Sequence, residues 1–263
     1  MPRKKAQAAV ADPGWTEKLH RPGAIAGVPG PGRWLVFAYE PTTLFSLKMS
    51  RATSSVGKTL LIPTPYAAKM AFVDAAFRGG WPGDVAGLVT ALASVDLRIG
   101  VSQKATVTHT IIKIRQEPKD RKSASTYISA VAYREFVHLT GPLRWAFDLA
   151  LGPELLATAL TDIAPTINYV GKRGSFIQFL GAERQARLDN RVFTQPLNGP
   201  ELQPTEAMHV ATLDDFGPEA TLDALNSFSE TQIRRGKHRV FRETLVPLGL
   251  LNVGPGFSEY STA

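Results

Sequence analysis

A proline corner followed by one amphipathic helix constrains this chain more than any other segment. The motif Pro63-Thr64-Pro65 fixes the backbone φ angle at both prolines and favours an extended conformation at the residue before each. The chain therefore leaves an apolar extended run at residues 60–62 and enters a helix over residues 66–78, with Tyr66 in its first turn. A Gly-Gly pair directly after residue 78 ends that helix.

The segment before this corner, Ser54-Ser55-Val56-Gly57-Lys58-Thr59, has the end of a nucleotide-binding P-loop but lacks its beginning. A P-loop requires a glycine five positions before the Gly-Lys pair, and that position is Ala52. The lysine is also followed by an apolar extended run where a P-loop would already be helical. We therefore reject an NTPase and predict a solvated basic loop, which stays compatible with RNA binding.

Length and composition limit the size of the folded domain, the kinds of site it can contain and the cellular location of the protein. The 263 residues, 44% of them hydrophobic, are enough for one large folded domain or one domain with long insertions. The chain has no cysteine, and its five histidines show no paired ligand spacing, so no metal-dependent site is expected, although a carboxylate site for magnesium stays open. No apolar run is long enough to span a bilayer, and no signal-peptide core follows the first residues, which favours a cytoplasmic protein without a membrane partner.

The positive charge gathers in four segments. Thirty Lys plus Arg residues against twenty-three Asp plus Glu give a net charge of +7 and a pI near 9.7. The cations cluster at residues 2–5, 113–122, 171–187 and 234–242. Each cluster alone is typical of a solvated face, but the last three together favour a surface that binds a polyanion.

The first half of the chain alternates strands and helices around a long hairpin. Residues 1–31 are rich in Ala, Pro and Gly and read as a mobile leader. Strand patterns occupy residues 34–39 and 95–101, and residues 84–94 form a second short helix or an insertion. Two further strand patterns, 104–115 and 125–137, flank a charged turn at 116–123, which predicts a long hairpin with a basic tip.

The second half repeats this order. A strand pattern at 143–149 precedes a helix over 153–163, and a glycine-rich basic loop follows at 168–176. Strands near 208–213 and 240–246 are expected to complete the sheet. We therefore predict an α+β fold with a ferredoxin-like βαββαβ core.

The chain resembles CRISPR-associated proteins of the RAMP superfamily, specifically the fifth Cas family, most closely over residues 33–180. The apolar strand at 34–39, the Leu-Leu-Ile-Pro-Thr-Pro-Tyr-Ala-Ala-Lys corner at 60–69 and the Gly-Lys-Arg-Gly-Ser-Phe loop at 171–176 carry this resemblance. The sequence departs from the family in one respect, because Met70-Ala71-Phe72 stands where many relatives have a glycine in the helix.

The resemblance implies a ferredoxin-like (RRM/RAMP) domain over 32–200, with the hairpin at 104–137 as an inserted thumb and a smaller β-rich region at 201–263 on the same domain. It implies a non-catalytic subunit of a type I surveillance complex, or Cascade, without a cofactor. Such a subunit caps the 5′ handle of the crRNA, joins the large subunit to the backbone subunit, and meets target DNA through the assembled complex.

The same resemblance guides the choice of RNA-binding residues, since single strands are held by cations and stacking side chains. Tyr127 and Phe176 are candidate stacking residues, for which a place in the core is an equal alternative. The candidate phosphate ligands are Arg51, Lys58, Lys113, Arg115, Lys172, Arg173, Arg234, Arg235 and Lys237.

Two other functions stay open. Some relatives are metal-independent endoribonucleases that cut the repeat RNA, and this chemistry needs a general acid and base. His109, Tyr127, His138 and His238 would supply these groups, but no spacing in the sequence unites them. An unrelated ribosomal or messenger-RNA-binding domain is the third alternative.

Overall fold

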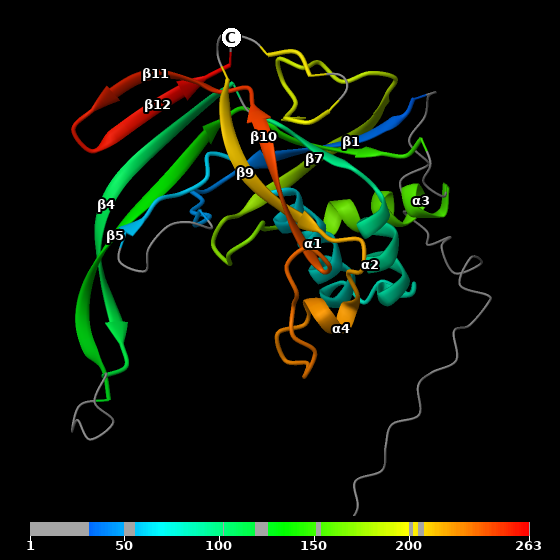
Figure 1. Cartoon of the computed structure of the whole chain (residues 1–263), viewed down its shortest axis with the longest axis horizontal. Helices are drawn as coiled ribbons and strands as arrows, with labels where there is room; N and C mark the ends of the chain where they lie inside the picture. Colours follow the sequence, from blue (N-terminus) through cyan, green and yellow to red (C-terminus); the bar gives the residue numbers. More distant parts are fainter. Residues whose placement is uncertain are drawn as a thin grey trace, which may run out of the picture.

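The computed structural model describes residues 32–49, 56–101, 103–118, 126–150, 154–199, 202–204 and 208–262. The leader at 1–31, Arg51 and most of the charged turn at 116–123 lie outside these residues. The described part is a mixed α+β fold whose strands form three sheets, antiparallel except for one pair (Figure 1). No helix in this part is long and apolar enough to cross a membrane.

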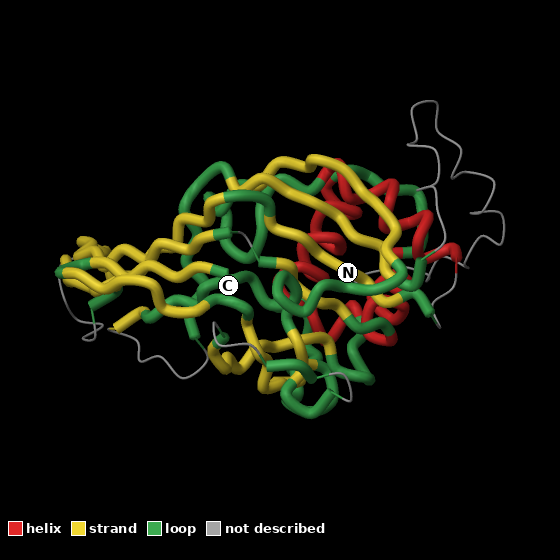
Figure 2. Tube along the Cα trace, turned by 90° about the horizontal axis from the view of Figure 1, so that it is seen from above, coloured by secondary structure: helices red, strands yellow, loops and turns green. Residues whose placement is uncertain are grey.

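The first sheet has the strand order β3-β6-β1-β7, and every neighbouring pair is antiparallel. Three helices and the short 3-10 helix η2 (Ala164–Thr166) lie together near this sheet, as Figures 1 and 2 show. The strands are β1 (Trp34–Pro41), β3 (Leu97–Gly100), β6 (Leu143–Asp148) and β7 (Ile177–Gln185), and the helices are α1 (Pro65–Arg78), α2 (Val85–Ser94) and α3 (Glu154–Ile163).

Strand β1 is buried on both faces, which explains its almost wholly apolar sequence. Phe37 and Tyr39 face the main core, where the Phe37 ring lies 5.5 Å from the ring of Phe72 on α1. Trp34 and Val36 alternate to the other face and pack in a second, smaller cluster with Phe193. The sheet therefore lies between the helices and the loop that precedes β8 (Gln195–Pro196).

Helix α1 begins and ends where the proline corner and the Gly-Gly pair predict. The Thr64 side chain accepts a hydrogen bond from the Ala67 amide, and Pro65 occupies the first helical turn. Gly79 caps the C-terminus, and Gly80 has a φ of 60°, in the left-handed region that favours glycine.

The predicted hairpin is present as β4 (Lys104–Gln116) and β5 (Ile128–Thr140), paired from Lys104 and Thr140 to Gln116 and Ile128. Its base is anchored in the core, since Val107 and Val137 are buried. Its outer half extends away from the body of the molecule (Figure 1). The hairpin belongs to a sheet of order β11-β12-β4-β5-β2, with β2 (Val56–Gly57), β11 (Gly249–Gly254) and β12 (Phe257–Ser261).

The strands predicted near 208–213 and 240–246 exist, but their predicted place in the central sheet is wrong. They are β9 (His209–Phe216) and β10 (Arg239–Val246), which form a separate sheet of order β8-β10-β9. The short helix α4 (Leu222–Leu225) lies between these two strands in the chain. Strand β7 completes the central sheet instead. This edge strand buries only Ile177 and contains Gly181, so its sequence lacks the regular alternation that identifies a strand.

A buried ion pair joins the sheet formed by β8, β10 and β9 to helix α1. The Lys69 ammonium lies 2.8 Å from Asp215 Oδ1 on β9 and donates a second bond of 2.9 Å to the Val95 carbonyl. Burial lowers the pKa of Lys69 and raises the pKa of Asp215, because each charged form loses water, while the pair's mutual attraction opposes both shifts. The Tyr66 and Phe216 rings pack edge to face at 5.3 Å beside this pair.

The substitution Lys69→Met should lower the free energy of unfolding by about 3–5 kcal/mol, because it leaves the Asp215 carboxylate buried without its partner. The matched control is Lys237→Met, which removes the lysine of an exposed pair with Glu219 and should cost about 0–1 kcal/mol. Urea unfolding measures both values. Equal losses in the two variants would show that the buried pair does not hold β9 on α1.

Candidate nucleic-acid interface

The glycine-rich loop at 168–176 is a tight turn that presents two cations to solvent. The Val170 amide donates to the Ser175 carbonyl at 3.1 Å, and a bridge joins Tyr169 to Phe176. Gly171 and Gly174 have φ values of 73° and 100°, which let the chain reverse within four residues. Between them, the predicted phosphate ligands Lys172 and Arg173 are exposed.

This turn rests on the segment at 42–49, which follows β1. The Thr43 hydroxyl donates to the Gly174 carbonyl and accepts from the Phe176 amide, each at 2.7 Å. A Cβ atom at Gly171 would come within 2.4 Å of a methyl carbon of Leu47. The absence of a side chain at Gly171 therefore lets the turn pack closely against this segment.

The same segment contacts the first basic loop. The Met49 amide donates to the Lys58 carbonyl at 3.1 Å, and the Leu60 amide donates to the Leu47 carbonyl at 2.8 Å. Lys58 is exposed, whereas Leu60 is buried. The loop that carries Lys58 and the turn that carries Lys172 thus lie against one segment, although more than 100 positions separate them in the sequence.

The C-terminal basic run reaches this segment too. Lys48 lines a cavity of about 250 Å³ together with Arg235, which comes from the turn before β10. Arg234 and Lys237 belong to the same turn, and Lys237 pairs with Glu219 at 3.1 Å. We call the segment 42–49 and the three basic segments around it the 42–49 junction, whose exposed cations are Lys48, Lys58, Lys172, Arg173, Arg234, Arg235 and Lys237.

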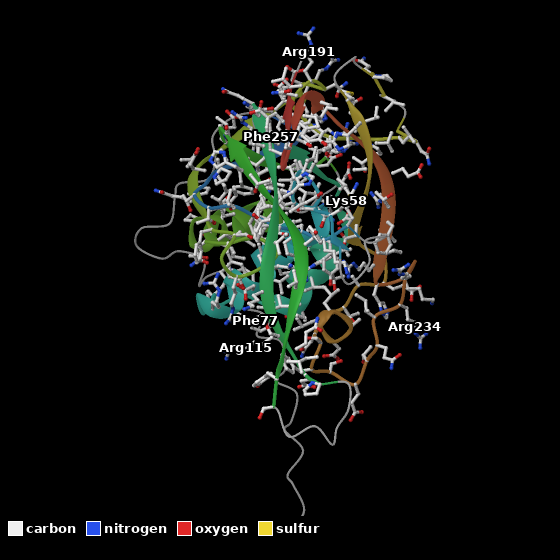
Figure 3. The ribbon with its side chains drawn as sticks, turned by 90° about the vertical axis from the view of Figure 1, so that its left-hand side faces the viewer. Lys58, Phe77, Arg115, Arg191, Arg234 and Phe257 are labelled. Carbon is white, nitrogen blue, oxygen red and sulfur yellow. The ribbon has the colours of Figure 1, made fainter. Side chains whose placement is uncertain are left out.

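The candidate residues on the hairpin lie apart from this junction. Lys113 and Arg115 are exposed on the outer half of β4, and Tyr127 lies near the tip, where these three residues line an open hollow. Figure 3 shows Arg115 toward the end of the hairpin, with Lys58 and Arg234 both to one side of it. The structure therefore divides the predicted residues between a junction on the body and a projecting arm.

Both predicted stacking residues are accessible. Tyr127 is 56% exposed and Phe176 is 47% exposed, so the alternative that these rings belong to the core is wrong. Phe176 lies directly after the glycine-rich turn, and its carbonyl accepts from the Thr42 amide at 3.0 Å. The backbone of this residue is thus fixed while its ring stays available to a ligand.

The groups considered for a ribonuclease do not meet in one place. His109 lies opposite Glu135, with Nε2 3.8 Å from Oε1, and not opposite Tyr127. Tyr127 directly precedes β5 at the far end of the hairpin, roughly 26 Å along the strand from His109 at about 3.3 Å per residue. His138 is paired with Thr106, on the opposite face of the hairpin, and His238 accepts from the Arg234 amide in the distant C-terminal turn.

Sequence reasoning missed three residues of these surfaces. Lys48 lies outside the four basic clusters of the sequence, and the fold brings it beside the first basic loop through the bridge that it forms with Thr59. Arg134 is a lone cation on β5, and its guanidinium lies over Gly57 of β2. Phe241 carried a usable signal, because strand alternation places it on the same face as Arg239 within the densest basic run.

Comparisons with known proteins find only remote similarity. No family model matches the chain, and no curated protein matches it. Its fold is similar to a CRISPR protein from Archaeoglobus fulgidus, with 9% identity, a TM-score of 0.39, and 88% of this chain and 92% of that chain covered. It is also similar to a chain of a CRISPR RNA-guided surveillance complex, with 15% identity, a TM-score of 0.40, and 88% and 91% covered. These similarities are too remote to place the chain in a family.

The two glycines of the turn should differ in their sensitivity to substitution. Gly171→Ala combines a left-handed backbone with a clash against Leu47, whereas a Cβ at Gly174 meets nothing within 4 Å. We expect Gly174→Ala to cost about 1–2 kcal/mol of stability and Gly171→Ala to cost more. Urea unfolding measures the difference. If Gly174→Ala proved the more costly, the close packing of the turn on Leu47 would be contradicted.

Proposed function

We propose that this chain is the RNA-binding subunit of a type I CRISPR surveillance complex that caps the 5′ handle of the crRNA. In this role it is non-catalytic and cytoplasmic, and it bridges the large subunit and the first backbone subunit. Target DNA reaches it through the assembled complex, and it needs no cofactor. The observation that carries the proposal is the convergence of three basic segments, far apart in sequence, on the 42–49 junction.

This convergence fits single-stranded RNA better than a small ligand. The cations Lys58, Lys172 and Arg234 are exposed, and no carboxylate of the described residues forms an ion pair with any of them. Several unpaired cations spread over neighbouring loops match the repeated phosphates of a strand. The exposed ring of Phe176 beside them provides the face on which a base can stack.

The order of the elements supports the ferredoxin-like (RRM/RAMP) assignment within this proposal. The central sheet is built from β1, β3, β6 and β7, with α1 between the first two strands and α3 between the last two. Their antiparallel order β3-β6-β1-β7 is the order expected of a βαββαβ core. The C-terminal region packs on the domain that begins at residue 32. Strand β12 pairs with β4, and an ion pair between Asp215 and Lys69 joins β9 to α1.

The projecting hairpin supports the role of a thumb. Ile111 and Tyr133 are directly opposite each other on its outer half and are 62% and 56% exposed. Lys113 and Val131 form the next pair on the same face, so apolar and cationic side chains alternate along it. An exposed face of this composition suits contact with both the bases and the phosphates of a strand.

The first test is incubation of the purified full chain with end-labelled CRISPR repeat RNA in chelator, followed by native and denaturing gels of the same samples. A shift on the native gel without a cleavage product supports the capping subunit. A single cleavage product would favour the endoribonuclease and make His109, Tyr127 and His138 the first residues to substitute. A chain that neither binds nor cuts the RNA would contradict both functions for the isolated subunit.

The double substitution Lys172→Ala with Arg173→Ala should weaken RNA binding and flatten its dependence on salt. Each phosphate contact with a single strand contributes about 0.7 to the slope of log K against log salt concentration, so two contacts contribute about 1.4. Fluorescence anisotropy at several salt concentrations measures this slope. Arg187→Ala with Arg191→Ala, two exposed cations outside the junction, is the charge-matched control and should leave the slope unchanged.

A further inference from the structure

A cavity at the edge of the 42–49 junction is lined by one aromatic ring, Phe241, and by the side chains of Arg235 and Arg239. The Arg239 guanidinium lies 4.3 Å from the centre of the Tyr66 ring and 5.6 Å from the centre of the Phe241 ring. The Arg235 guanidinium lies over the Phe241 ring at 4.9 Å. Burial raises the pKa of Tyr66, so its phenol stays neutral beside Arg239.

The inner end of the cavity holds a carboxylate with one uncommitted oxygen. Asp214 is 7% exposed, and its Oδ2 accepts from Arg239 Nε at 2.6 Å. Both contacts of this ion pair use Oδ2, and Oδ1 has no hydrogen-bond partner among the described residues. The Thr212 hydroxyl, two residues earlier on the same face of β9, also has none within that part of the chain. Two polar groups at the cavity are therefore available to a ligand.

The mouth of the cavity is cationic. Lys48 and Arg235 line it and are exposed, and neither forms an ion pair with a carboxylate of the described residues. The cavity as a whole therefore combines an anion-binding entrance, an aromatic and guanidinium wall, and a hydrogen-bond acceptor at its inner end. Its volume of about 250 Å³ lies just below the range of about 300–1,000 Å³ typical of drug-sized ligands.

We propose that this cavity holds one nucleotide of the bound RNA, with its base turned out of the strand. The base stacks on the wall formed by Phe241 and Arg235, its amino group donates to Asp214 Oδ1, and its phosphates lie against Lys48 and Arg235. This inference rests on the proposed function and deepens it, because it adds the recognition of a base to the binding of the backbone.

The acceptor at the inner end gives the cavity a preference among bases. Guanine, adenine and cytosine carry an exocyclic amino group that can donate to the Asp214 carboxylate. Uracil has no amino group, and its one donor on this edge, N3–H, lies between two carbonyl oxygens that would both face the carboxylate with unfavourable charge. We therefore expect the cavity to select an amino-bearing base over uracil.

The test measures binding of the full chain to 12-nucleotide RNAs by fluorescence anisotropy. One RNA is all uridine, and the others have a single central guanosine, adenosine or cytidine. We expect these three to bind about fivefold or more tightly than the uridine RNA. Phe241→Ala should abolish this preference and weaken binding of every RNA, because the stacking face is lost.

Two further variants separate recognition from folding. Asp214→Asn keeps the shape of the side chain, and because its single oxygen accepts from Arg239, an amide donor replaces the acceptor that faces the base, so the preference for an amino-bearing base should disappear. Because Asp214 also pairs with Arg239, the exposed Arg235→Ala is tested beside it and should weaken binding of every RNA without lowering the unfolding midpoint. Phe228→Ala, which removes a ring that is 96% exposed and does not line the cavity, is the control and should change neither quantity.

The outcomes distinguish this inference from the proposed function. If the wild-type chain binds none of the RNAs, the proposed function fails. If it binds all four equally, and Phe241→Ala and Arg235→Ala behave as wild type while Lys172→Ala with Arg173→Ala weakens binding, only the nucleotide cavity is overturned. If inorganic phosphate competes with the RNA as well as guanosine monophosphate does, the cavity binds an anion and not a base.

Discussion

The placement of α1 between two sheets depends on one buried lysine. The Lys69 ammonium is surrounded by Asp215 of β9, the Val95 carbonyl between α2 and β3, and the ring of Phe216 at 5.8 Å. The lysine and these groups belong to three parts of the chain that are otherwise joined by apolar packing, which is tolerant of small shifts. A charge without water requires its partners at short range, so it sets the position of β9 relative to α1. Since β9 also carries Thr212 and Asp214, the geometry of the nearby cavity follows from this contact.

Local signals in the sequence were enough to place most of the first half of the fold. The corner at 63–65 predicted α1 to within one residue, and the alternating patterns on either side of 116–123 predicted the hairpin. The neighbour of each strand in its sheet was harder to predict. The alternation of apolar and polar residues shows which face of a strand is buried, but it does not show which other strand forms hydrogen bonds with it. Strands β9 and β10 were therefore assigned to the wrong sheet. Strand β7 was missed because, as an edge strand, it is only partly buried and keeps polar residues such as Glu183 on it.

The residues of the candidate interface were predictable where cations are close together in the sequence. They were not predictable where only the fold brings the cations together. Lys172 and Arg173 were found because two glycines bracket them, and the structure places both on an exposed turn. Lys48 and Arg134 lie outside the four basic clusters of the sequence, and they join the others through a bridge to Thr59 and the pairing of β2 with β5. Lys237 shows the opposite case. Its sequence context suggested a phosphate ligand, whereas the fold places Glu219 beside its ammonium group.

The five-stranded sheet also determines the order in which the chain can finish folding during synthesis. Strand β4 pairs with β5 on one side, but its other side pairs with β12, which leaves the ribosome about 140 residues later. At about 5–20 residues per second, that edge stays unpaired for on the order of 10 s. The part of this edge that β12 later covers includes Thr106-Val107-Thr108, residues of high β-propensity that can pair with another nascent chain in that interval. The late arrival of β12 thus makes the hairpin a site where slow synthesis or crowded translation would favour misassembly.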